Sequence, residues 1–192
     1  MPPKAKFTRE TIIDTAFIIT QEQGIDAVTA RELGKRLGSS ARPIFTVFAS
    51  MEEVKELVIL RAKELYQQYV EEGLKNELPF KGIGLAYIRF ASEQPKLFQL
   101  LFMSVFSKDL DISSILPILD EHYDRTLQSI QEPFYLEKEP AQRLYQHLWI
   151  YTHGIATMIV TGLCSYSMEQ IEENMTEIVT GLLLLEERKK GA

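Results

Sequence analysis

Apolar residues recur along this chain at intervals of three and four positions, the spacing expected of amphipathic helices. No segment alternates apolar and polar residues strictly enough to predict a strand, so the predicted fold class is all-α. A first helix is expected from a cap at Thr8 to Gln23, with Gly24 ending it. Its predicted buried stripe consists of Ile12, Ile13, Ala16, Phe17 and Ile19 or Thr20.

Residues 29–54 show a different pattern, in which two short apolar segments flank a glycine turn. If Ala30 begins the first short helix, the residues expected to be buried between the two helices are Leu33, Leu37, Ile44 and Val47. Gly34 falls at their closest approach, and Gly38 at the turn can adopt a positive φ without a Cβ clash. The spacing alone fits a DNA-binding helix-turn-helix and an ordinary helical hairpin equally well.

Capping residues mark the start of each short helix. Thr29 and Glu32 are spaced as a capping box for the first, although the Thr29 hydroxyl could also face a phosphate. Ser39 and Ser40 are cap candidates for the second, and Pro43 lies in its first turn, where no intrahelical amide bond is lost.

The remainder of the chain is predicted to form longer helices. Ser50 and Glu53 are spaced as another capping box, and the helix they start is expected to run through Leu57, Leu60, Leu65 and Tyr69 toward Asn76. The subsequent helices are expected from a lead-in at Gly82 and Gly84 to about Glu93, from Pro95 through a Phe-rich stripe, and over residues 112–131, 141–166 and 168–189.

The segment IFTVFASMEEV, which follows QGIDAVTARELGKRLG, resembles the N-terminal DNA-binding domain of the TetR family of transcriptional regulators. The resemblance covers the first quarter to third of the chain and is carried by Ile44, Phe45, Phe48, Ser50, Glu52, Glu53 and Val54. It implies a three-helix DNA-binding domain over residues 1–50 and a larger helical domain for dimerisation and ligand binding over residues 51–192.

Two positions depart from the family pattern. The family usually has a tyrosine where this chain has Phe45 and a lysine where it has Met51, and both groups commonly contact DNA phosphates. Either DNA affinity is lower than usual or other cations take more of the phosphate contacts, and we favour the second reading. The candidates are Lys4, Lys6, Lys35, Arg36 and Arg42, and Arg9 at the start of the first helix could also reach the duplex backbone.

The recognition helix is expected to span about residues 41–48. Arg42 lies at its start with a side chain long enough to reach a guanine edge, Thr46 could donate to a base or phosphate, and Pro43 could pack on a thymine methyl. The residues predicted to bind DNA are Thr29, Lys35, Arg36, Ser39, Ser40, Ala41, Arg42, Pro43, Phe45 and Thr46.

The net charge of −6 does not by itself predict a DNA-binding protein, but the charge is unevenly distributed. Residues 1–50 hold seven Lys and Arg against five Asp and Glu, a net charge of +2, whereas residues 51–192 hold fourteen against twenty-two, a net charge of −8. Because phosphate repels the acidic part, we expect only the N-terminal end to approach a duplex.

The last two predicted helices are apolar over more than one stripe, which a single subunit cannot bury. We therefore predict a homodimer with interface residues Met158, Gly162, Ile171, Met175, Ile178 and Leu182. The family resemblance implies a two-fold four-helix interface that sets two recognition helices about 34–36 Å apart, matching an inverted-repeat operator in double-stranded DNA.

Aromatic and weakly polar residues in the helical part are candidates for a ligand pocket: Tyr87, Phe98, Phe102, Met103, Phe106, Tyr123, Trp149 and His153. Core packing explains such aromatic residues more often than ligand binding does. Their chemistry suits a small hydrophobic effector. With the family resemblance, they predict a sequence-specific repressor that the effector releases from DNA. The alternative is a helical interaction module of the same fold that has lost strong DNA binding.

Other classes of protein receive little support. The chain has no glycine-rich phosphate loop, serine elbow or His-Glu metal pair, so we expect no enzyme, no catalytic residues, no cofactor and no metal site. Cys164, the single cysteine, is expected to be a small core or interface residue. Because neither a signal peptide nor an apolar membrane-spanning segment is recognisable, a cytoplasmic protein is expected.

Overall fold

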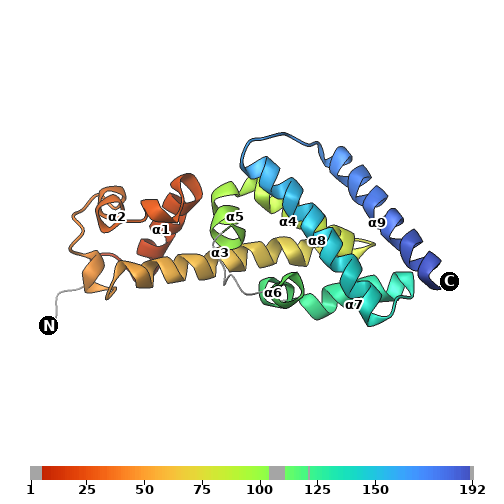
Figure 1. Cartoon of the computed structure of the whole chain (residues 1–192). Coiled ribbons are helices and arrows are strands. Elements are labelled where there is room, and N and C mark those ends of the chain that lie inside the picture. Colours follow the sequence, from red (N-terminus) through yellow and green to blue (C-terminus); the bar gives the residue numbers. More distant parts are fainter. Residues whose placement is uncertain (1–5, 104–110, 121, 191–192) are drawn as a thin grey trace. The chain divides into compact units, whose positions relative to one another are not determined.

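The computed structural model describes residues 6–103, 111–120 and 122–190, and these ranges contain α helices and two 3-10 helices but no strand (Figure 1). The predicted all-α class is confirmed. The chain forms two compact units. The N-terminal unit runs to Gln67 and also includes Gln94–Ser104, and the C-terminal unit comprises Gln68–Glu93 and the chain from Val105 onward.

The N-terminal unit contains the short elements of the chain: α1 (Arg9–Gln23), η1 (Ile25–Ala27), α2 (Ala30–Arg36), η2 (Ile44–Thr46), the first part of α3 (Met51–Gly73) and α5 (Pro95–Phe102). Local chemistry sets their ends as predicted. The Thr8 hydroxyl accepts a hydrogen bond from the amide of Thr11 at 3.1 Å, and Gly24 ends α1 with φ at 91°.

The core of the N-terminal unit is formed around α1, which contacts α2 and α5. Its buried apolar residues include Ile12, Ala16, Phe17, Ile19, Leu33, Ile44, Phe48, Leu97 and Phe98. In the part of α3 that belongs to this unit the buried side chains are Val54, Val58 and Ala62, whereas Leu60 is 54% exposed. The helix carries apolar residues on two faces, and only its neighbours decide which one is covered.

The C-terminal unit is organised around α8 (Lys138–Val160), which contacts α4 (Pro79–Glu93), α6 (Ile112–Leu119), α7 (Tyr123–Phe134) and α9 (Met168–Lys190) (Figure 1). One apolar cluster in this unit contains Phe80, Leu116, Leu127, Ile130, Leu136, Ala141, Leu144, Tyr145 and Leu148. A second contains Ile88, Ile155, Ile171 and Met175.

Two of the predicted long helices end earlier than expected. The helix over residues 112–131 is instead two, α6 and α7, separated at Asp120, whose carboxylate accepts hydrogen bonds from the Tyr145 hydroxyl at 2.6 Å and the His122 amide at 2.8 Å. Helix α8 ends at Val160 rather than near Tyr166, because Gly162 adopts a φ of 69°.

The glycines of α4 lie inside the helix instead of leading into it. A Cβ on Gly82 would lie 2.0 Å from the carbonyl oxygen of Gly73, and a Cβ on Gly84 would lie 2.6 Å from the Met175 methyl carbon. Both glycines therefore allow close packing of α4 against its neighbours.

Candidate nucleic-acid interface

Helix α2 and the turn after it have the geometry that the sequence predicts. The Thr29 hydroxyl caps α2 by accepting from the Glu32 amide at 3.2 Å, and Gly38 adopts a φ of 63°. A Cβ on Gly34 would lie 2.9 Å from the backbone carbon of Ser40. This position therefore requires glycine for the two segments to approach, as predicted.

The residues after this turn, 41–48, are called the recognition segment. Its only regular helix is the 3-10 turn η2, although backbone hydrogen bonds extend from the Ile44 amide to the Ala41 carbonyl and from the Phe48 amide to the Ile44 carbonyl, at 3.1 and 3.0 Å. The expected span is retained, but the expected helix is shorter and tighter. Bonds to the third preceding residue predominate, a geometry that proteins use in short pieces.

Burial divides the recognition segment into anchors and exposed residues. Ile44 is fully buried and Phe48 is 2% exposed, whereas Arg42, Phe45 and Thr46 are exposed. Leu33 is buried as expected, while the other predicted core positions, Leu37 and Val47, are only half-buried. Phe48 rather than Val47 is the second anchor.

The two serines of the turn do not cap η2 as expected. No side chain caps this helix, whose N-cap position is occupied by Pro43. The Ser39 hydroxyl instead accepts a hydrogen bond from the Lys6 ammonium at 3.0 Å, and the Ser39 amide donates to the Gly34 carbonyl at 2.8 Å. Ser39 therefore ties the start of the described chain to the turn.

The predicted phosphate-binding cations differ in their availability. Arg36 donates to Glu22 at 2.5 Å and to Glu32 at 3.2 Å, and these hydrogen bonds, Glu22 first, raise its pKa. Within the N-terminal unit its guanidinium thus links α2 to α1, which argues against its predicted role in DNA binding. The side chain of Lys35 is 78% exposed, 4.0 Å from Glu32.

Arg42 and Arg31 are both exposed, and neither side chain has an ion pair or hydrogen bond with another residue in the described part of the chain. Sequence reasoning included Arg42 but missed Arg31. The sequence feature that could have identified Arg31 is its position two residues after the Thr29 cap. This places it on the first turn of α2, and helix N-termini are favourable sites for phosphate. Lys4, another predicted cation, lies outside the described residues.

The predicted ligand-pocket residues divide into separate groups. In the C-terminal unit the Tyr87 hydroxyl lies 2.8 Å from His153 Nδ1, and the Trp149 ring stacks on the His153 ring at 4.8 Å. Tyr123 instead contacts Tyr145 at 5.6 Å between ring centroids. In the N-terminal unit Phe98 and Phe102 contact each other at 5.2 Å, and Met103 is 40% exposed. Phe106 lies outside the described residues.

His153 is half-buried, and desolvation lowers the pKa of its imidazole. The ring therefore favours the neutral form, which suits an apolar surrounding.

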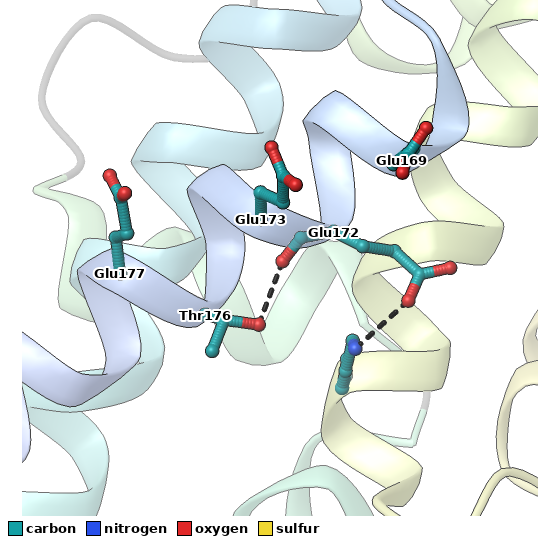
Figure 2. A pocket seen from close by; sticks show the side chains of 6 residues that line it. Glu169, Glu172, Glu173, Thr176 and Glu177 are labelled. Carbon is teal, nitrogen blue, oxygen red and sulfur yellow. Dashed lines mark hydrogen bonds and ion pairs between the residues drawn. The ribbon is translucent and has the colours of Figure 1, made fainter.

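A depression of about 820 Å³ in the C-terminal unit has acidic rather than aromatic walls (Figure 2). Its lining residues are Lys81, Glu169, Glu172, Glu173, Thr176 and Glu177, and Lys81 donates to Glu172 at 3.0 Å. None of them belongs to the predicted pocket. The acidic surface is consistent with the negative charge counted for residues 51–192.

The predicted dimer interface needs correction at two positions. Ile171 and Met175 are 1% and 2% exposed and pack against Ile88 and Ile155 within the subunit, so their side chains are not available to a second copy. Gly162 is exposed beyond the end of α8, and its positive φ explains the glycine. The remaining predicted residues, Met158, Ile178 and Leu182, are half-buried.

No helix within the described ranges combines the length and apolar character needed to cross a membrane. His, Cys, Asp and Glu side chains in those ranges form no group of three or more that could hold a metal ion. Cys164 is half-buried.

Comparison with known proteins adds two findings. Residues 12–57 match the family model described as bacterial regulatory proteins, tetR family. The chain is also 20% identical over 190 residues to YobS of Bacillus subtilis (strain 168), an uncharacterized HTH-type transcriptional regulator, with 96% of this chain and 97% of the relative covered. These matches confirm the resemblance of the N-terminal part of the chain to the TetR family.

Proposed function

We propose that this chain is a DNA-binding regulator of the TetR family, acting as a homodimeric, cytoplasmic transcriptional repressor that a small hydrophobic ligand releases from an inverted-repeat operator. The observation that carries the proposal is the recognition segment, in which two buried anchors hold exposed polar and aromatic side chains. A short element of this kind can enter the major groove. We assign DNA binding to residues 1–50, and dimerisation and ligand binding to residues 51–192.

Within the interface we separate base-reading from phosphate-binding residues. Arg42, exposed and without an ion pair in the described chain, is assigned to a guanine edge. Lys35 and Arg31 are assigned to phosphates on the basis of their exposure. The Phe45 side chain, 49% exposed, is assigned to apolar contact with a thymine methyl or sugar because it lacks a hydroxyl donor.

The dimer is supported by large apolar side chains that remain exposed on or beside the last two helices. Ile150 on α8 is 51% exposed, and Leu184 and Leu185 on α9 are 53% and 52% exposed. A second copy would cover these side chains and the exposed parts of Met158, Ile178 and Leu182, which also pack against the apolar clusters of their own subunit. Acidic residues nearby would form the rim of that interface.

The proposed effector site is centred on Tyr87, Trp149 and His153. The three rings lie within 6.5 Å of one another by centroid, and their polar atoms include the bonded Tyr87 hydroxyl and His153 Nδ1. Aromatic walls with a few polar groups suit a hydrophobic small molecule.

The test is selection of bound duplexes from a random pool by the full chain. Enrichment of an inverted repeat is expected, and its affinity should fall with a slope of about −0.9 in log K against log salt for each phosphate contacted. No enrichment at low salt would instead favour the interaction module. The specific observation behind that alternative is that Phe45 and Met51 lack the hydroxyl and charge that the family usually directs at phosphates.

A further inference from the structure

Arg9, the first residue of α1, contacts residues that lie far along the sequence. One guanidinium nitrogen, Nη2, donates to Glu53 Oε1 at 2.6 Å, and Nη1 donates to the Val47 carbonyl oxygen at 3.4 Å. The centre of the guanidinium lies 4.3 Å from the centroid of the Phe48 ring. A single side chain thus contacts the end of the recognition segment and the start of α3.

Glu53 is itself fixed by the backbone around it. Its other carboxylate oxygen accepts from the Ala49 amide at 2.8 Å, and its own amide donates to the Ser50 hydroxyl at 3.2 Å. The hydrogen bond from Arg9, followed by that from Ala49, lowers the pKa of Glu53, so the carboxylate stays charged near neutral pH. Arg9 therefore bonds to a carboxylate that is already attached to the residues following the recognition segment.

The recognition segment needs such an external support. Its regular helix is a single 3-10 turn, and its buried anchors, Ile44 and Phe48, hold it on one side only. Apolar packing is non-directional, whereas hydrogen bonds specify orientation. The contacts of Arg9 with the Val47 carbonyl and the Phe48 ring are suited to fix the rotation of the segment about its anchors.

We propose that Arg9 is a positioning residue for DNA recognition, which orients residues 41–48 through Val47, Phe48 and Glu53 and does not itself neutralise a phosphate. The inference rests on the proposed DNA-binding function and replaces the sequence-based expectation that Arg9 reaches the duplex backbone. A planar guanidinium can stack on Phe48 while it donates to two acceptors, which a lysine ammonium cannot do. A phosphate contact, by contrast, needs only a positive charge within reach.

The chain provides a matched control in Arg61. This arginine, in the same N-terminal unit, donates to Asp14 and lies 5.0 Å from the Phe17 ring centroid. It thus combines an ion pair with an aromatic contact, as Arg9 does, and links α3 to α1. Neither Asp14 nor Phe17 belongs to the recognition segment. Arg61→Lys should therefore reproduce the structural cost of Arg9→Lys without disturbing residues 41–48.

The experiment compares Arg9→Lys, Arg9→Gln and Arg61→Lys with the unaltered chain, on the selected duplex and on a scrambled duplex. Arg9→Lys is expected to weaken binding to the selected duplex by roughly tenfold or more, because a charge-assisted hydrogen bond that orients the recognition segment is lost. Binding of Arg9→Lys to the scrambled duplex should equal that of the unaltered chain. The salt slope of Arg9→Gln should also equal that of the unaltered chain. Arg61→Lys should lower the melting temperature comparably and leave the affinity unchanged.

Hydrogen exchange provides a readout that needs no DNA. Amides of residues 44–49 should exchange faster in Arg9→Lys than in the unaltered chain or in Arg61→Lys. Equal exchange in all three proteins would overturn the inference. It would also be overturned if lysine restored full affinity while glutamine reduced the salt slope by about 0.9, since Arg9 would then contact a phosphate. Failure of the unaltered chain to select any duplex, with faster exchange in Arg9→Lys, would contradict the proposed function and not the positioning role.

Discussion

The two compact units differ in what specifies their helices. In the N-terminal unit the helix starts are set by hydroxyl caps at Thr8 and Thr29, and the turns by Gly24 and Gly38 at positive φ. In the C-terminal unit α8 and α9 each run for 23 residues, and their faces are determined by apolar clusters with the other helices. Local chemistry determines where these short helices begin and end, whereas packing determines which faces of the long helices are covered. The first kind of information is contiguous in sequence and the second is not.

The largest expected effect is on packing in the C-terminal unit. Leu144 is 2% exposed in the larger apolar cluster, and Leu144→Ala should lower the free energy of unfolding by about 2–5 kcal/mol through lost burial and a residual cavity. Urea denaturation followed by circular dichroism measures it. Ile118→Ala, at a side chain of the same unit that is 60% exposed and lies outside the proposed dimer surface, is the control, with an expected change within about 0.5 kcal/mol. An equal loss in both variants would contradict the assignment of the core.

The close approach in the N-terminal unit should be the next most sensitive feature. Gly34→Ala places a Cβ 2.9 Å from the Ser40 backbone, so either α2 or the turn must shift, at a cost of about 1–3 kcal/mol. DNA affinity should fall as well, because the recognition segment begins at Ala41, the residue after Ser40. Thermal unfolding and duplex binding test the two effects. Ser40→Ala, at an exposed position, should leave stability unchanged.

Arg42 and Lys35 provide a functional contrast within the N-terminal unit. Arg42→Ala should reduce discrimination at one base pair by about 1–3 kcal/mol, because a guanine contact is lost. Lys35→Ala should weaken binding to all duplexes alike and reduce the salt slope by about 0.9. Repeating the duplex selection with each variant measures both. A sequence-selective loss in Lys35→Ala, or unaltered preference in Arg42→Ala, would reverse these roles.

Capping should have a smaller effect. Thr29→Ala removes the acceptor for the Glu32 amide and should cost about 1 kcal/mol of unfolding free energy. Thr176 in α9 provides a matched control, since its hydroxyl donates to the Glu172 carbonyl of its own helix at 2.7 Å and caps nothing (Figure 2). Thr176→Ala should change stability by less than about 0.5 kcal/mol. If the two variants are equally stable, local capping does not specify α2.

The smallest expected effect is the pH dependence that His153 confers on the C-terminal unit. Desolvation lowers its pKa in the folded protein below the ordinary value of 6.5. Stability from this group is therefore fully present above pH 6.5 and is lost as the pH falls through that value toward the folded pKa, because the unfolded chain takes up the proton first. Unfolding free energies at about pH 7.5 and about pH 5.5 should differ less in His153→Gln than in the unaltered chain.

Much of the N-terminal unit was predictable from the sequence. The ends of α1 and the start of α2 agree with the predicted residues, and the requirement for glycine at positions 34 and 38 is confirmed. Each of these features depends on a hydrogen bond or a backbone angle within a few residues. The exceptions are Ser39, which accepts from Lys6 rather than capping η2, and Leu37 and Val47, which are only half-buried.

The apolar pattern of α9 was less informative. Ile171 and Met175 are apolar and have the helical spacing expected of residues at a subunit interface, yet they are buried within the subunit. An apolar stripe indicates that a side chain will be covered but does not identify what covers it. The same difficulty applies to Arg36, whose partners Glu22 and Glu32 make it a link between helices.

The sequence by itself determined the all-α class, the short capped helices, the glycine turn and the resemblance to the TetR family, because these depend on neighbours along the chain. Only the tertiary structure decided which face of α3 is buried, which apolar residues of α9 are internal and which arginines remain available. Those outcomes depend on pairs such as Arg9 and Glu53, which are 44 positions apart. The recognition segment depends on both the local sequence and the tertiary structure. Its turn is set by neighbouring residues, whereas the contacts that orient it come from residues distant in sequence.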